Sequence, residues 1–183
     1  MDESDFIQLS QQGDVNSFNK LVQLYQKQVF NLALRMLGNI PAAEDVSQDA
    51  FILAWKGIRG FKGPNFKAWL LRIAANACRD QLRKLKHEPE LSLEASFSDL
   101  SQTTSAKSTE NVVISRELAD EIQRGLVGLP WEQRLAVTLC DIEGLSYKEI
   151  SQVMHCSLGT VRSRLSRGRA RLRDYLVSRG LLT

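Results

Sequence analysis

Six arginines lie within the twelve residues from Arg162 to Arg173, and the first acidic residue after them is Asp174. Guanidinium groups bind phosphates and the edges of guanine bases through paired hydrogen bonds. Charged side chains that only face solvent on a helix more often alternate in sign, because opposite charges one turn apart form ion pairs. The run of arginines therefore favours a nucleic-acid contact, and a solvated helix face is the plainer alternative.

The residues between the arginines indicate how a helix would present them. On a helical wheel, the apolar side chains of this stretch fall within about 60° of one another. They are Leu158, Val161, Leu165 and Leu172. The opposite side and its two edges carry guanidinium groups and small hydroxyls. They are Ser163, Arg167, Arg162, Ser166, Arg164 and Arg171.

A shorter helix is predicted immediately before this one. Ser146 has the hydroxyl of an N-cap residue, and Glu149 follows at the spacing of a capping box. Ile150 and Met154 repeat one turn apart on an apolar face, and Ser157 is the N-cap candidate that opens the next helix. Two helices joined by a tight turn are typical of a helix-turn-helix, whose second helix enters the major groove of DNA.

A second candidate site begins at a glycine-rich loop, residues 57–66. Its aromatic and basic residues are Arg59, Phe61, Lys62 and Phe66. Exposed rings beside cations stack on unpaired bases and hold them. In the alternative interpretation, both rings turn inward and the loop only connects two helices.

The helix predicted after this loop has one apolar side and is otherwise basic. Its packing side consists of Trp69, Leu70, Ile73, Ala74, Ala77 and Leu82. Its other sides carry Lys67, Arg72, Asn76, Arg79, Arg83, Lys84 and Lys86. A basic helix with an amide in its middle, next to an aromatic loop, suits recognition of a single nucleic-acid strand.

The segment from 41 to 58 is predicted to form a helix with two different faces. Its buried stripe would be Ala43, Val46, Ala50, Leu53 and Ala54. The acidic, amide and aromatic residues that do not all fit on this stripe are Glu44, Asp45, Gln48, Asp49, Phe51 and Trp55. Two interpretations stay open: the acids compensate the helix dipole, or they form a protein-docking face edged by exposed aromatics.

The remaining apolar patterns are helical, and no segment shows a convincing β-strand alternation. A long amphipathic helix, capped by Asn16 or Ser17, is predicted to end at Gly38. Helices resume over 112–129 and 130–144, after a stretch rich in Ser, Thr and acids that is typical of a flexible linker. The sequence predicts an all-α protein with two helical domains, residues 1–88 and 112–183, joined by a linker of residues 89–111.

Charge is distributed unevenly along the 183 residues, although the net charge is only +3. Counting Lys and Arg against Asp and Glu, the first domain carries 12 and 9, the linker 1 and 4, and the second domain 11 and 8. Two mildly basic blocks around an acidic connector fit a protein that binds nucleic acid locally and keeps acidic surfaces for protein partners.

Neither catalysis nor a bound cofactor or metal is predicted. The sequence has no Gly-rich phosphate loop, no metal-ligand cluster and no triad-like grouping. Its three cysteines are not spaced for zinc or for a disulfide framework, which favours a reducing compartment. The acidic and polar first residues do not resemble a signal peptide, and no apolar run approaches the roughly 18 residues of a membrane span. We therefore expect a cytoplasmic protein without membrane contact of its own.

Four stretches resemble the extracytoplasmic-function (ECF) group of bacterial RNA polymerase sigma factors. AEDVSQDAFILAW is similar to the polymerase-docking helix of region 2.2, and FKGPNFKAWLLRIAANACRDQLRK to the loop and helix of regions 2.3 and 2.4. LPWEQRLAVTLCDIEGLSYKEIS resembles region 4.1, and CSLGTVRSRLSRGRARLR resembles region 4.2. The resemblance implies that residues 1–88 are sigma region 2 and residues 112–183 are sigma region 4, with no region 3 domain between them.

The same resemblance implies partners: core RNA polymerase, contacted at its β′ clamp helices and β flap, promoter DNA, and an anti-sigma factor. It matches Asp45, Gln48, Phe51 and Trp55 to polymerase-facing positions, and the neighbouring Asp49 is included with them. Phe61, Lys62 and Asn76 match positions that read the −10 element, to which the basic side of the helix adds Arg72, Arg79 and Arg83. Arg162, Ser163, Ser166 and Arg167 match positions that read the −35 element, with Thr160 and Arg164 at phosphate contacts. Asp80 departs from the amides and basic residues expected near the −10 strand.

Two other functions are compatible with the residues themselves. An autonomous helix-turn-helix regulator would bind DNA as a dimer without polymerase, and would need a dimer interface or an input domain within residues 1–88. A helical adaptor that binds only proteins would keep its function when Arg162 and Arg167 are replaced by alanine.

Overall fold

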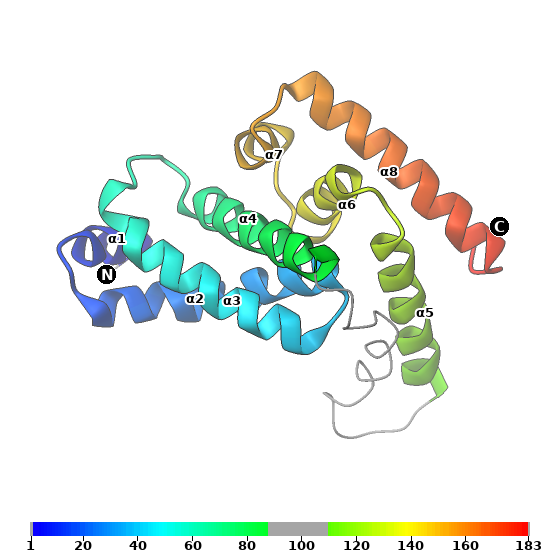
Figure 1. Ribbon diagram of the computed structural model, residues 1–183, viewed down its shortest axis with the longest axis horizontal. Helices are drawn as coiled ribbons and strands as arrows, with labels where there is room; N and C mark the ends of the chain where they lie inside the picture. Colours follow the sequence, from blue (N-terminus) through cyan, green and yellow to red (C-terminus); the bar gives the residue numbers. More distant parts are fainter. Residues whose placement is uncertain (1, 88–109, 183) are drawn as a thin grey trace.

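The computed structural model describes residues 2–87 and 110–182, without the side chains of 86, 87 and 110–116. All regular structure in these described ranges is helical, which confirms the all-α prediction (Figure 1). The predicted linker lies outside the described residues except for its last two, Glu110 and Asn111, which begin a helix.

Residues 2–87 form a first group of helices, called here the N-terminal bundle. It contains α1 (Glu3–Gln11), α2 (Val15–Leu37), α3 (Ile40–Gly57), the 3-10 turn η1 (Ile58–Gly60) and α4 (Phe66–His87). The N-cap of α2 is Asp14, whose carboxylate accepts from the N–H groups of Asn16 and Ser17, so the predicted caps are wrong by two or three residues. Gly38 ends α2 with a left-handed φ of 72°, as predicted.

Residues 110–182 form the C-terminal bundle. It contains α5 (Glu110–Val127), α6 (Trp131–Val137), a π-helical turn η4 (Thr138–Ile142), α7 (Tyr147–Met154) and α8 (Leu158–Ser178). Ser146 accepts from the Glu149 N–H and Glu149 accepts from the Ser146 N–H, which confirms the capping box. Ser157 accepts from the Thr160 N–H and caps α8, so both helices of the predicted helix-turn-helix form.

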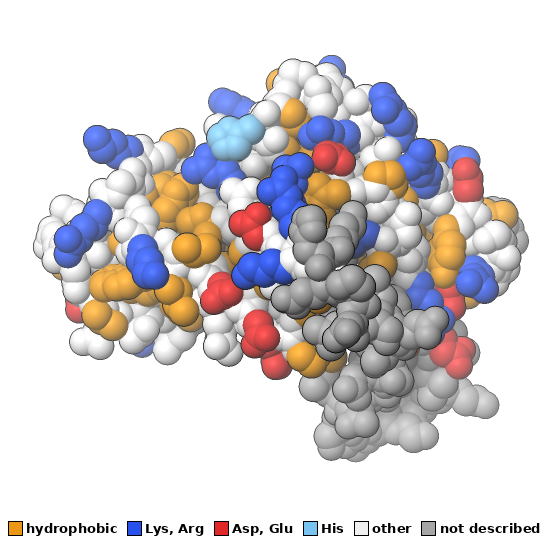
Figure 2. All heavy atoms as spheres, in the orientation of Figure 1, with side chains coloured by type: hydrophobic (Ala, Val, Ile, Leu, Met, Phe, Trp, Pro, Cys, Tyr) orange, Lys and Arg blue, Asp and Glu red, His pale blue; other side chains and the backbone are white. Residues whose placement is uncertain are grey.

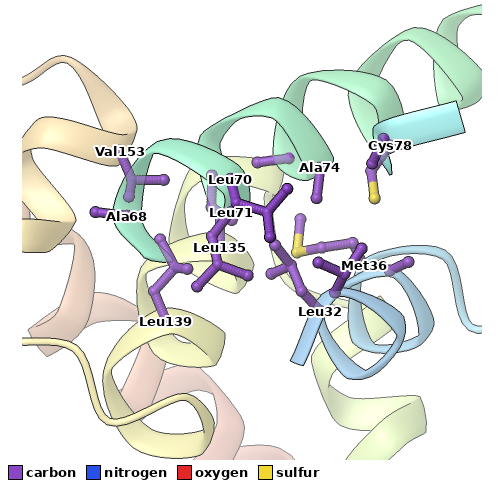
Figure 3. Close-up of a cluster of buried hydrophobic side chains, with 14 of the residues drawn as sticks. Leu32, Met36, Ala68, Leu70, Leu71, Ala74, Cys78, Leu135, Leu139 and Val153 are labelled. Carbon is purple, nitrogen blue, oxygen red and sulfur yellow. The ribbon is translucent and has the colours of Figure 1, made fainter. Parts of the chain in front are cut away.

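The two bundles pack directly against each other. Figure 3 shows a continuous apolar core in which side chains of α2 and α4 meet those of α6, η4 and α7. Buried residues of this core are Leu32, Met36, Ala68, Leu70, Leu71, Leu135, Leu139 and Val153. Leu71, absent from the predicted packing side, is buried because α4 is covered by α2 and α3 and also by α7.

Candidate nucleic-acid and polymerase interfaces

The helix α8 presents most of its arginines to solvent. Val161 and Leu165 are buried and form the inward face of α8. Arg162 and Arg167 lie on other faces of the helix and are exposed. Figure 2 shows Lys and Arg side chains along the edge of the molecule that α8 forms. Leu158, predicted on the apolar face, is 44% exposed because it is the first residue of the helix.

Two of the six arginines of α8 have acidic partners, which corrects the expectation that none is answered before Asp174. Arg169 forms a two-point ion pair with Asp141 of η4, in which Nε lies 3.0 Å from Oδ2. This pair raises the pKa of Arg169. Arg173 donates to Asp174 itself at 2.8 Å. The pairing with Asp141 joins residues 28 positions apart, so helical spacing within the sequence did not indicate it.

The exposed edge of α8 borders a shallow hollow with a volume of ≈ 560 Å³. It is lined by Tyr147, Arg162, Leu165, Ser166, Arg169, Ala170 and Arg173. Arg162 and Ser166 were predicted from the sequence, whereas Tyr147, Arg169 and Arg173 were not. The other predicted −35 residues do not line this hollow. Ser163 donates to the Thr160 carbonyl at 3.0 Å. Arg164 is half-buried, and Arg167 is exposed.

The aromatic rings of the glycine-rich loop are turned inward. Phe61 is only 9% exposed, and its ring centroid lies 5.5 Å from that of Phe66 and 5.1 Å from that of Trp69. Gln11 of α1 donates to the carbonyls of Phe61 and Ile58, at 2.7 and 3.2 Å, and fixes the loop in place. The expectation of an exposed aromatic is therefore wrong for Phe61, because the ring completes an aromatic cluster.

A second hollow, of ≈ 420 Å³, lies between this loop, the start of α4 and α7. Phe61 and Trp69 contribute aromatic surface to it, and Lys62 and Arg72 contribute positive charge. Its lining also includes Gly60, Gly63, Pro64, Asn65, Ala68, Gln152 and His155. This hollow thus brings together three of the predicted −10 residues, namely Phe61, Lys62 and Arg72.

The other predicted −10 residues follow along α4. Asn76, Arg79 and Arg83 are exposed. Asp80, the residue that departs from the family pattern, lies 3.7 Å from Arg83 in a solvent-exposed ion pair. Such pairs contribute little to stability. The predicted −10 residues therefore form two groups, one at the hollow and one on open helix surface.

The predicted polymerase face of α3 is acidic and apolar. Asp45, Gln48 and Asp49 are exposed as predicted, but Phe51 and Trp55 are half-buried, and the Trp55 ring packs 5.0 Å from that of Phe18. The exposed apolar residues are instead Ile52 and Leu53, at 51% and 48% exposure. Figure 2 shows apolar side chains gathered over α3.

Leu53 was predicted to be buried, and this prediction is wrong. The inward stripe of α3 is Ala43, Val46, Ala50 and Ala54. Leu53 precedes Ala54 by one residue, which turns its side chain by about 100° away from that stripe. Ile52 and Leu53 instead line a groove of ≈ 300 Å³ between α3 and α4, together with Val46, Asp49, Lys56, Ala77, Asp80, Gln81 and Lys84.

Comparisons with known proteins decide the family. Residues 21–88 match the family described as Sigma-70 region 2, and residues 119–172 match Sigma-70, region 4. The chain is 36% identical over 172 residues to the ECF RNA polymerase sigma factor SigW of Bacillus subtilis, covering 90% of this chain and 91% of that protein. The chain belongs to the ECF sigma factor family.

Another relative is the ECF RNA polymerase sigma factor SigE of Mycolicibacterium smegmatis, 38% identical over 166 residues. That match covers 90% of this sigma factor and 63% of the relative, so the chain spans under two thirds of that protein's length. A solved structure of the sigma factor RpoE in complex with the anti-sigma factor NepR, from Bartonella quintana, is 28% identical with a TM-score of 0.71. The match covers 88% of this chain and 98% of the matched chain in that structure. Across the described parts of this sigma factor, no helix is both long and apolar enough to cross a membrane.

Proposed function

We propose that this sigma factor binds core RNA polymerase through α3 and directs transcription initiation at promoters that have two recognition elements. The loop before α4 and α4 itself would read the −10 element, and α8 would read the −35 element. The observation that carries this proposal is that each half of the chain, matched to sigma region 2 or region 4, places basic residues on an exposed helix. The protein would act in the cytoplasm, as an initiation factor without catalysis of its own.

The −35 assignment rests on the way α8 is held. Val161 and Leu165 pack inward, which fixes the rotation of the helix and directs Arg162, Ser166 and Arg167 outward. A recognition helix reads bases with the residues near its N-terminus, and arginine bonds bidentately to guanine in the major groove. Thr160 and Arg164 remain the candidates for phosphate contacts, which set register rather than sequence preference.

The −10 assignment rests on the hollow and on Asn76. Extruding a base from the duplex costs a few kcal/mol, which a protein offsets by stacking and by hydrogen bonds to the base edge. The inward rings of Phe61 and Trp69 give the hollow a rigid aromatic floor, and Lys62 adds positive charge at its rim. Asn76, exposed further along α4, offers an amide that can donate to and accept from a base.

The polymerase assignment rests on α3. Ile52 and Leu53 form an apolar centre, and Asp45 and Asp49 supply negative charge on the same helix. An apolar centre with a charged rim is the usual anatomy of a protein-binding surface. An anti-sigma factor is the expected regulator, because the similar solved structure holds the sigma factor RpoE in complex with the anti-sigma factor NepR.

Run-off transcription with purified core polymerase tests the proposal. With a library of genomic fragments, the sigma factor should produce promoter-specific transcripts that core polymerase alone does not make. Leu53→Asp should weaken polymerase binding at least tenfold, because it places a charge in the apolar centre. Leu24→Asp is the matched control, since Leu24 is 52% exposed on α2 and does not line the groove that contains Ile52 and Leu53. If the wild-type chain produces no promoter-specific transcripts, the proposal is wrong.

A further inference from the structure

The loop between η1 and α4 has a short exposed segment between two fixed points. Phe61 is buried, and its N–H donates to the Ile58 carbonyl at 3.0 Å. Asn65, immediately before α4, accepts from the Ala68 N–H at 2.8 Å. Residues 62–64, called here the loop tip, lie between these points and are exposed. The position of the loop tip therefore depends on how Phe61 and Asn65 are held.

The first of these points is held by α1. Gln11, the last residue of that helix, donates through Nε2 to the Phe61 carbonyl at 2.7 Å and to the Ile58 carbonyl at 3.2 Å. A side-chain amide has two N–H donors, so it can serve both carbonyls at once. Ile58 begins the 3-10 turn η1 and Phe61 follows its last residue. One amide therefore spans the whole turn that leads into the loop tip.

The other end of α1 is attached to the aromatic cluster on which the loop packs. Tyr25 of α2 donates through its hydroxyl to Glu3 Oε1 at 2.9 Å, and its ring centroid lies 5.6 Å from that of Phe66. The Phe66 ring in turn lies 5.5 Å from that of Phe61. The helix α1 is thus connected to the ring cluster at its first residue and to the loop backbone at its last.

Packing alone does not fix the loop tip against α1. A hollow of ≈ 480 Å³ lies between them, and its lining includes Gln8 and Gln11 of α1 and Gly63 and Pro64 of the loop tip. Because side chains do not fill this space, the hydrogen bonds of Gln11 supply a connection that contact across it does not. The match to Sigma-70 region 2 begins at residue 21, so α1 is a helix that this match does not include.

We propose that Gln11 is a positioning residue for the −10 element, because it holds the loop tip where the bases can be discriminated. The inference rests on the proposed function, which assigns this loop to the −10 element. Base readout needs aligned hydrogen bonds, which weaken steeply when donor and acceptor move out of line. Phosphate contacts carry affinity without sequence information, and the exposed Arg79 and Arg83 can make them from α4 whatever the loop does. A loosened loop tip therefore loses discrimination more than affinity.

Transcription from a library of barcoded templates tests the inference. The −10 element is randomised in a promoter obtained from the run-off experiment, and the −35 element is kept constant. Gln11→Met retains the length of the side chain and removes its donors. The preference for the best base over the next should fall about tenfold at positions that the loop reads, the size of one lost base contact. In a second library with only the −35 element randomised, the preference should equal that of the wild type.

Two variants separate hydrogen-bond donation from shape. Gln8→Met is the matched control, because Gln8 is exposed on α1 and lines the same hollow without donating to the Phe61 or Ile58 carbonyl. Its −10 preference should equal that of the wild type. Gln11→Glu retains size and polarity, but an ionised carboxylate can only accept. It should therefore behave as Gln11→Met, and a wild-type preference in Gln11→Glu would overturn the inference.

Hydrogen exchange of the full chain, without DNA or polymerase, measures the loop itself. In Gln11→Met, peptides that cover residues 58–65 should exchange about tenfold faster, because the turn loses two of its hydrogen bonds. Peptides from α7 should exchange as in the wild type, which excludes general unfolding.

The two measurements together distinguish failure of the inference from failure of the proposed function. A wild type that selects no −10 motif would overturn the −10 assignment and the inference with it. A wild-type −10 preference in Gln11→Met, with or without faster exchange of the loop, would overturn the inference alone. An equal fall in preference at both promoter elements would also contradict a positioning role.

Discussion

The two bundles of this sigma factor both present a basic helix, but they hold it in different ways. In the N-terminal bundle, long helices pack closely through small apolar residues, and Ala43, Ala50 and Ala54 of α3 are fully buried. The C-terminal bundle also has an apolar core, but it buries larger polar side chains, among them Gln123 and Arg134, which donate to carbonyls at the end of α2. Among its described residues, the N-terminal bundle buries only serines as polar side chains, whereas the C-terminal bundle buries polar groups that must keep their hydrogen-bond partners.

This difference has a consequence for function. The helix α4, proposed to read the −10 element, is buried on several sides and leaves only part of its basic surface free. The helix α8, proposed to read the −35 element, rests on α5, α6 and α7 with one face and leaves the remainder open. The C-terminal bundle should therefore be more sensitive to single polar substitutions. Its recognition surface should also be available before that of the N-terminal bundle.

The largest effect is expected from Arg134→Met. Arg134 donates to the carbonyls of Met36, Leu129 and Val127, and burial lowers its pKa to about 10. Removing the guanidinium leaves several buried carbonyls unpaired, at a cost of about 3 kcal/mol in the free energy of unfolding. Urea denaturation measures this loss. The exposed control Arg171→Met should change stability by less than about 0.5 kcal/mol, and equal effects of both substitutions would remove the contrast between the bundles.

A smaller loss is expected from Gly168→Ala, in the middle of α8. An added Cβ would lie 2.8 Å from Val137 Cγ2 and 3.2 Å from the Gln133 carbonyl oxygen. Overpacking of this kind costs about 1–3 kcal/mol, and it would also shift α8 relative to α6. Gly159→Ala is the control, because its nearest neighbour would be Ser157 Oγ at 3.7 Å. The midpoint temperature of thermal unfolding should fall only for Gly168→Ala. An unchanged midpoint for Gly168→Ala would show that α8 packs less tightly on α6 than described.

On the N-terminal side, Asn76→Ala should separate DNA reading from folding. Asn76 is exposed, so its removal should leave stability unchanged. Loss of one base contact should reduce open-complex formation about tenfold, within the 1–3 kcal/mol that such contacts contribute. Permanganate reactivity of the melted strand measures this step, and binding to a −35 duplex serves as the internal control. Equal losses in both assays would indicate misfolding instead.

The smallest effect concerns the cap of α7. Hydrogen bonds from Ser146 lower the pKa of Glu149, so this carboxylate stabilises the fold fully above the unfolded value of about 4.3 and progressively less as pH falls through its folded pKa. Ser146→Ala should cost about 1 kcal/mol at neutral pH. In denaturation between pH 7 and pH 3, the difference from the wild type should shrink at the acidic end. A difference independent of pH would contradict a role for Glu149 in this cap.

Local features of this fold were predictable from the sequence, because they depend on residues close together in the chain. The capping box of Ser146 and Glu149, the cap at Ser157 and the left-handed Gly38 are of this kind. The helical nature of the chain follows from the same short-range patterns.

Features that depend on tertiary contacts were missed. Asp141 pairs with Arg169 across 28 residues, which no helical spacing indicates. Leu71 is buried because a second bundle covers α4. Leu53 is exposed because its side chain is turned by about 100° from the inward stripe that contains Ala54. The inward position of Phe61 had been one of two open interpretations, since composition alone does not show whether a ring completes a cluster.

Sequencing of transcript 5′ ends, with core polymerase and either the wild type or Arg167→Ala, tests the central claim most directly. If α8 reads the −35 element and α4 the −10 element, the wild-type start sites share two motifs. Arg167→Ala should then relax preference at one position of the −35 motif, by about 1–3 kcal/mol, and leave the −10 motif unchanged. A −35 motif that is unchanged in Arg167→Ala, or a −10 motif that changes with it, would contradict the claim that two separate helices read the two elements.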